Sequence, residues 1–201
     1  AVADLDIDGA TDIGADLVDA DEIIVDDGGG GTNRRCDMSR LKTYIGGGIT
    51  EADQWRLTTD YTGTATITAN LERVDSKAFN YLGTGMSHSS GIFTFPSTGY
   101  WYLEMYSSFM YNNGTSTYAM NHIVTTDDNS SYTEVTSGST VISAGLSGTH
   151  TQSSSSYIVD VTNTTNVKVK FGTQVQNTDV ITNGSTSENV TYMTFIRLGD
   201  T

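Results

Sequence analysis

The chain has 201 residues, of which 36% are hydrophobic and 17% are charged, and its formal net charge is −14. This length suits one domain of ordinary size with an appendage. So negative a chain repels phosphate backbones and anionic lipid surfaces, which argues against nucleic acid and membranes as partners. The single cysteine excludes an intrachain disulfide. Many Thr, Tyr and Val residues beside Gly, Asn and Ser favour β-strands joined by turns.

The first part of the chain is acidic: residues 1–27 hold nine Asp, one Glu and no Lys or Arg. The stretch DLDIDG (residues 4–9) resembles the start of an EF-hand calcium loop, which ends in a bidentate Glu at its twelfth position. The twelfth residue counted from Asp4 is Ala15, so the EF-hand hypothesis fails. We expect these aspartates to be solvated, or paired with basic side chains of this or a neighbouring chain: Arg34, Arg35 and Arg40.

The following residues predict a short hairpin and a short helix. An apolar strand at residues 23–25, a glycine-rich turn at 27–32 and a return at 33–38 form the hairpin. Ser39 is a candidate N-cap for one or two helical turns that end at Ile45. Such a short helix is marginal alone, and the segment has few apolar residues. We therefore expect this segment to need partner chains.

The composition divides the chain into three parts. The N-terminal segment spans residues 1–45, a glycine-rich linker spans 46–53, and a larger domain spans 54–201. Glycine runs bend freely and pack poorly, which places the boundary at the linker.

The larger domain contains a long predicted strand, GYWYLEMYSSFMY, at residues 99–111. One of its faces carries Trp101, Leu103, Met105 and Phe109, and the other carries Tyr100, Tyr102, Tyr106 and Met110. Because both faces are largely apolar or aromatic, we expect both to be buried. One would meet the domain core, and the other a second sheet or another subunit. Further alternating stretches separated by turn residues predict a β-sandwich or jelly roll.

The stretch GIFTFPSTGYWYL (residues 91–103) resembles the central signature of the complement globular-head and tumour-necrosis-factor superfamily. The matching positions are Gly91, Phe93, Thr94, Gly99, Trp101 and Tyr102. The closing stretch YMTFIRLGD also resembles the last strand of this family, through Phe195 and Leu198. The resemblance covers residues 54–201.

This resemblance implies a ten-stranded jelly-roll sandwich that assembles as a compact homotrimer. It implies a core that includes Phe93, Trp101, Leu103, Met105 and Leu198. It also implies an interface around the threefold axis, formed by Tyr100, Tyr102, Tyr106, Met110 and Phe195. The residues alone leave a second arrangement open, a monomeric sandwich that buries both faces of the long strand itself.

The N-terminal segment carries a second resemblance. The stretches ADEIIVDDGGGGTNRR and MSRLKTY, at residues 20–35 and 38–44, resemble a segment of tailed-phage virion proteins, especially tail fibres and appendages of marine phages. In such proteins the segment lies near the attachment or shaft end. The resemblance implies that residues 1–45 attach this chain to a virion, through Ile23, Ile24, Val25, Arg34, Arg35, Leu41 and Tyr44.

Together the two resemblances imply a homotrimeric structural protein located in the virion. We expect a short tail fibre or similar appendage whose partners are other tail or capsid proteins and a host surface glycan or protein. A capsid decoration protein or head fibre with the same trimer is an open alternative. A polysaccharide depolymerase is less favoured, because it needs two carboxylates in a groove and only Glu104 and Glu134 stand out in the middle strands.

We expect neither an enzyme nor a cofactor. The three histidines, at positions 88, 122 and 150, lack the paired spacing of a zinc site, and no G-x-S-x-G elbow occurs. We also expect no metal, and the weak calcium candidates are Asp127 and Asp128 in the stretch TTDDNSS.

Overall fold

The computed structural model describes residues 14–26, 33–45, 48–76, 78, 80–111, 114–143 and 148–201. The chain divides into two compact units, Ala1–Gly48 and Ile49–Thr201. The division falls inside the expected linker, but the last two residues of that linker already belong to a strand that begins at Ala52. Within the described ranges, no helix has the length and apolar character needed to span a bilayer.

The first unit contains a hairpin of β1 (Glu22–Asp26) and β2 (Asn33–Asp37), followed by α1 (Met38–Ile45). The glycine turn expected between the strands lies outside the described residues. Ser39 lies within the helix and not before it, so the expected N-cap is wrong. The first backbone N–H groups are satisfied instead by carbonyl oxygens, since Met38 donates to Asp21 at 2.8 Å and Ser39 to Asp19 at 3.3 Å.

None of the described side chains in the first unit is fully buried. Several large apolar side chains are exposed there, and Tyr44 keeps 90% of its surface accessible. A two-stranded hairpin and an eight-residue helix are each marginal without packing partners. These elements therefore lack a core of their own among the described residues.

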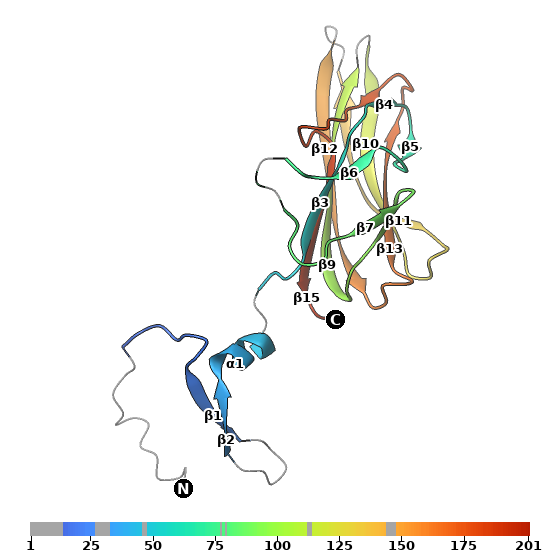
Figure 1. Ribbon diagram of the computed structural model, residues 1–201. Helices are drawn as coiled ribbons and strands as arrows, with labels where there is room; N and C mark the ends of the chain where they lie inside the picture. Colours follow the sequence, from blue (N-terminus) through green and yellow to red (C-terminus); the bar gives the residue numbers. More distant parts are fainter. Residues whose placement is uncertain are drawn as a thin grey trace. The chain divides into compact units, whose positions relative to one another are not determined.

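The second unit is a sandwich of two antiparallel sheets (Figure 1). The six-stranded sheet contains, in order, β11 (Thr133–Ile142), β10 (Ser116–Thr126), β13 (Lys168–Val175), β8 (Ile92–Thr94) and β7 (Ser87–Ser89), with β5 (Ala65–Thr66) also paired to β13.

The seven-stranded sheet is built around β9 (Gly99–Tyr111). The strand β12 (Thr149–Val161) pairs along its whole length. On the opposite edge of β9, β15 (Tyr192–Gly199) and β14 (Ile181–Thr182) pair with two successive stretches of the strand. The sheet continues from β15 to β3 (Ala52–Leu57) and β6 (Leu71–Arg73), and from β14 to β4 (Tyr61–Thr62).

The expectation of a mostly β sandwich is confirmed, with one correction to its strand count. The described residues form thirteen strands in the two sheets and not ten. The additional count comes from short pieces such as β4, β5 and β14, which have two residues each. Such short pairings give no readable alternation in a sequence.

The core lies between the two sheets and is rich in aromatic rings. Phe93 packs edge-on against Phe171, with ring centroids 5.5 Å apart, and its ring centroid lies 5.1 Å from that of Phe195. The expected core residues Phe93, Trp101, Leu103 and Met105 all lie in this cluster.

Two residues of β15 lie on the opposite sides from those expected. Phe195, expected at a subunit interface, is fully buried in the core, whereas Leu198, expected in the core, is 51% exposed. The alternation of β15 buries Met193 and Phe195, while a register irregularity follows Arg197. Apolar residues occur on both faces of this strand, so the sequence did not indicate which face is inside.

Two buried charges stabilise the side of the sandwich at β3 and β6. Arg56 is fully buried, and its guanidinium donates to Glu72 and Asp75 at 2.7 Å each. Buried Asp53 accepts hydrogen bonds from Arg73 at 3.1 Å and from the Trp55 indole at 3.0 Å. Each charge therefore has the partners that burial requires.

The edge strands of the two sheets, β11 and β12, meet closely. A Cβ added at Gly138 would collide with the carbonyl oxygen of Ser154, so only glycine allows this approach. The hydroxyls of Thr140 and Thr151 hydrogen-bond across the same junction at 2.6 Å. The sandwich is therefore closed here by backbone packed against backbone.

Candidate functional site

The outward face of the seven-stranded sheet is the first candidate site, and β9 forms its centre. Tyr100, Tyr102, Tyr106 and Met110 alternate with buried residues of the strand, so they lie on the face directed away from the core. Of these, Tyr100 is 43% exposed. The structure thus brings together on one face four of the five residues expected at a trimer interface, and their contact with another chain stays a prediction.

Neighbouring strands extend this face with further apolar side chains that the sequence analysis did not single out. Ile158 of β12 and Ile196 of β15 flank Tyr102 in the strand register. Tyr192 lies opposite Tyr106, and the two rings stack with centroids 5.2 Å apart and planes 20° from parallel. Ile158 is 55% exposed. We call these six residues the aromatic face: Tyr100, Tyr102, Tyr106, Ile158, Tyr192 and Ile196.

A row of polar side chains crosses the aromatic face. Glu104 lies between Ser156 and Thr194 in the strand register, and the Gln54 amide donates to the Thr194 hydroxyl at 3.0 Å. Burial, with a smaller contribution from the negative charge of Glu104, raises the pKa of Tyr192. The Tyr192 hydroxyl therefore stays protonated and able to donate a hydrogen bond near neutral pH.

The arrangement suits association with another protein surface. Single apolar side chains are common on protein surfaces, but contiguous apolar patches are typical of interaction sites. Tyrosine fits such a surface, because its ring becomes buried while its hydroxyl keeps a hydrogen-bond partner. Glu104 and Glu134 lie on strands of different sheets, β9 and β11.

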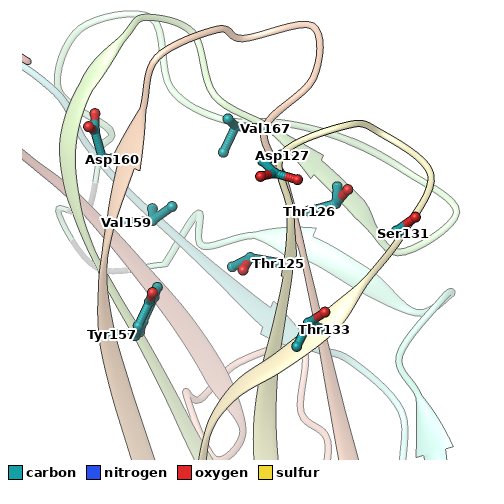
Figure 2. A pocket seen from close by; sticks show the side chains of 9 residues that line it. All are labelled: Thr125, Thr126, Asp127, Ser131, Thr133, Tyr157, Val159, Asp160 and Val167. Carbon is teal, nitrogen blue, oxygen red and sulfur yellow. The ribbon is translucent and has the colours of Figure 1, made fainter.

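A pocket of about 360 Å³ is the second candidate site (Figure 2). It lies between the two sheets, where the end of β10 and the start of β11 face β12. Figure 2 shows Asp160 pointing away from the cavity, and this residue lies opposite Tyr100 on the outward face of β12 and β9. The lining consists of Thr125, Thr126, Asp127, Ser131, Thr133, Tyr157, Val159, Asp160 and Val167. Sequence reasoning missed this pocket, because it joins the ends of strands that are separate in the chain.

The weak calcium candidates have different surroundings. One Asp128 oxygen accepts hydrogen bonds from the backbone N–H groups of Ser130 and Ser131 at 2.8 and 2.7 Å, and from the Thr126 hydroxyl at 2.7 Å. These bonds hold the pKa of Asp128 well below its usual range. Asp128 thus shapes the turn, and only Asp127 lines the pocket. Among the residues that the structure describes, no cluster of three potential metal-ligating side chains occurs.

The residues expected to attach the chain to a virion lie on the first unit. Arg34 and Arg35 are exposed on β2, and the Arg35 guanidinium lies 3.0 Å from the Glu22 carboxylate. Ile24 and Tyr44 are exposed, whereas Ile23, Val25 and Leu41 are half-buried.

A groove of about 290 Å³ lies on the same unit. It is mostly apolar and has one acidic and one basic residue, whose charged atoms are 3.6 Å apart. It is lined by Leu17, Val18, Asp19, Met38, Leu41, Lys42 and Ile45. The sequence analysis named only Leu41 of this set.

Comparisons with known proteins bear on the fold. No family model matches the chain, and no curated protein matches it. Among solved structures, an Eiger TNF from S. frugiperda matches with a TM-score of 0.56 and 9% identity, over 77% of this chain and 96% of that one. Murine APRIL at pH 5.0 matches with a TM-score of 0.51 and 10% identity, over 74% of this chain and 98% of that one. The fold is a tumour-necrosis-factor-like jelly roll.

A PRD1 vertex protein is also similar, with 15% identity over 76% of this chain and 100% of that one. Its TM-score is 0.44. At these identities the likeness to solved structures concerns the jelly-roll fold alone. Any assignment of function to this chain must come from its own residues.

Proposed function

We propose that this protein is a non-enzymatic structural component of a tailed-phage virion, a short tail fibre or similar appendage with a homotrimeric jelly-roll head. The aromatic face is the observation that supports the homotrimer. It places four tyrosines and two isoleucines on one side of a sheet whose other side already forms the core. Two further copies of the chain would cover this surface.

The virion assignment rests on the sequence of the N-terminal segment. Its resemblance to tailed-phage appendage proteins supports an attachment role for residues 1–45. The lack of buried side chains among the described residues of this unit agrees with that role, because the unit needs a partner to complete its packing. Exposed Arg34, Arg35 and Tyr44 offer charged and aromatic contacts to another virion protein.

Light scattering tests the assembly. The trimer is expected to have three times the chain mass of 21.6 kDa. A monomer at micromolar concentration would remove the basis for an interface on the aromatic face.

Electron microscopy of purified particles, labelled with antibody against residues 54–201, tests the location. Label at the tail supports an appendage. Label confined to the capsid would favour a decoration protein or head fibre built from the same trimer. Particles without label would overturn the virion assignment.

Incubation with host polysaccharide tests the absence of an enzymatic role. We expect no released oligosaccharides, because Asp160 points away from the pocket that Asp127 lines and the two carboxylates do not converge on a groove. Release of oligosaccharides, lost when either carboxylate is replaced by an amide, would establish a depolymerase instead.

A further inference from the structure

Glu104 lies in the middle of the aromatic face. Along β9 its neighbours on the same face are Tyr102 and Tyr106, each two residues away, which is about 7 Å in a strand. On the adjoining strand β15, Tyr192 and Ile196 lie opposite these two tyrosines. The carboxylate thus stands between four aromatic and aliphatic side chains, and a surface that covers all four also covers Glu104.

The surroundings of Glu104 offer it no charge of opposite sign. It is half-buried in the single chain, and the residues directly opposite it on the two adjoining strands are Ser156 and Thr194. Water solvates the carboxylate as long as the face is open. Assembly through the aromatic face removes this water, and a buried carboxylate then requires a cationic partner or a proton.

The arginines of the second unit are already engaged within the chain. The basic residues of this unit are Arg56, Arg73, Lys77, Lys168, Lys170 and Arg197. The first of the three arginines forms ion pairs with Glu72 and Asp75, the second with Asp53 and the third with Asp200. A guanidinium that left its carboxylate for Glu104 would only move the unpaired negative charge to another place.

The described lysines of this unit are engaged as well. The Lys168 ammonium donates to the Thr94 hydroxyl at 3.0 Å. The Lys170 ammonium lies 3.4 Å from the centre of the Tyr132 ring. Lys77 lies outside the described residues. The described part of the second unit therefore supplies no uncommitted cation for three Glu104 carboxylates that meet in a trimer.

We propose that assembly through the aromatic face takes up protons at Glu104, so that the trimer tightens in acid and loosens in base. A proton neutralises each carboxylate as it leaves water, because burial disfavours the charged form of an acid. The proposal deepens the proposed function and rests on it in one respect, that copies of the chain meet on the aromatic face. The acidity of the surroundings then regulates how firmly the copies are joined.

The other ionisable groups of this face lie toward its ends or are phenols. Asp160 lies opposite Tyr100, four residues from Glu104 along β9, which is about 13 Å. His150 lies opposite Met110, six residues away in the other direction, which is about 20 Å. These separations exceed the Debye length of about 8 Å at physiological ionic strength. The tyrosine hydroxyls are uncharged in neutral and acidic solution.

Sedimentation equilibrium of the full chain tests the proposal, with a fluorescence-detected dilution series where the trimer is tight. Each proton taken up on assembly raises the assembly constant about tenfold for each unit by which the pH falls. The wild type should therefore tighten at least roughly tenfold per unit between about pH 8 and about pH 5, and up to roughly a thousandfold if all three carboxylates take up a proton. Glu104→Gln keeps the size of the side chain and removes its charge. This variant should assemble more tightly than the wild type at the alkaline end and should respond less to pH.

Glu134→Gln is the matched control, because Glu134 is an exposed glutamate on β11 of the other sheet and the variant loses the same charge. Acidification also reduces the general repulsion between chains that each carry a net charge of −14. Salt screens that repulsion, but it screens a buried carboxylate much less. The control should keep the pH dependence of the wild type, and the difference between the wild type and Glu104→Gln should persist in about 1 M salt, where the Debye length is about 3 Å.

Four results would overturn the proton linkage. In the first, assembly of the wild type does not change with pH, and in the second, Glu104→Gln keeps the full pH dependence. In the third, Glu104→Gln assembles more weakly than the wild type, which would mean that a cation of a neighbouring copy pairs with the carboxylate. In the fourth, assembly at constant pH requires calcium, so that a metal ion and not protons neutralises the three carboxylates.

The same measurements separate this inference from the proposed function. A trimer that forms equally well at every pH overturns only the proton linkage. A chain that stays monomeric over the whole range overturns the proposed assembly, and the proton linkage with it.

Discussion

Replacing Ile158 by Asp should break the trimer without unfolding the chain. Ile158 is 55% exposed on the aromatic face, so an isolated chain tolerates a charge at this position. Full burial of an isoleucine contributes about 1.5–3 kcal/mol, so covering the exposed half contributes about 1 kcal/mol or somewhat more in each copy. Three copies lose about 3–4 kcal/mol of apolar burial. Desolvation of three carboxylates adds several kcal/mol more.

A loss of about 3 kcal/mol or more weakens assembly at least roughly a hundredfold. Light scattering and sedimentation velocity over a range of concentrations measure this change. The wild type should keep three times the 21.6 kDa chain mass, while Ile158→Asp should fall to the mass of one chain. Circular dichroism of the variant should retain the β-sheet spectrum.

Val141→Asp is the matched control, because Val141 is 60% exposed on β11 of the other sheet. This variant should assemble like the wild type. The reasoning is refuted by an Ile158→Asp variant that stays trimeric, or by a control that dissociates to the same extent.

Three further predictions concern the stability of the jelly roll. Leu103→Ala, at a fully buried position of β9, should lower the free energy of unfolding by about 2–5 kcal/mol in a denaturant titration. Gly138→Ala should cost about 1–3 kcal/mol because its methyl group collides with Ser154, whereas Gly199→Ala, which has open space around it, should change the unfolding midpoint little. The depressed pKa of Asp128 stabilises the fold above its unfolded pKa of about 4, and this stability is lost as pH falls toward the folded-state pKa. Below pH 4, the free energy of unfolding of Asp128→Asn should therefore change less with pH than that of the wild type. The same pH dependence in both proteins would contradict a stabilising role for the ionised Asp128 carboxylate.

The sequence predicted the two faces of β9 because this strand is long and the face directed outward is rich in tyrosine, whose hydroxyl favours a partly exposed position. Trp101 and Leu103 point to the core, while Tyr100 and Tyr102 point outward. Alternation is a direct consequence of strand geometry, so a long strand shows it clearly. The same rule failed on β15, where Phe195 and Leu198 were exchanged, because apolar residues occupy both faces and only tertiary packing decides between them.

The candidate sites were predictable only in part. The tyrosines of the aromatic face lie within one strand and were visible together, whereas Ile158 and Tyr192 join them through pairing with strands far along the chain. The pocket residues Asp127 and Tyr157 lie after β10 and within β12, with the whole of β11 between them, and have no motif in common. Buried Arg56 likewise gave no signal, since its partners become evident only when β3 meets β6 and the loop after it.

The close junction at Gly138 also limits how copies of the chain can meet. A strand at the edge of a sheet offers unpaired backbone groups to any other strand, and pairing of this kind continues from molecule to molecule into fibres. Here Gly138 of β11 covers the free side of β12 at Ser154, so that route is blocked at the middle of both edges. On this side of the sandwich, copies are left to meet through side chains on sheet faces, where sequence determines fit and rotational symmetry limits the number of subunits.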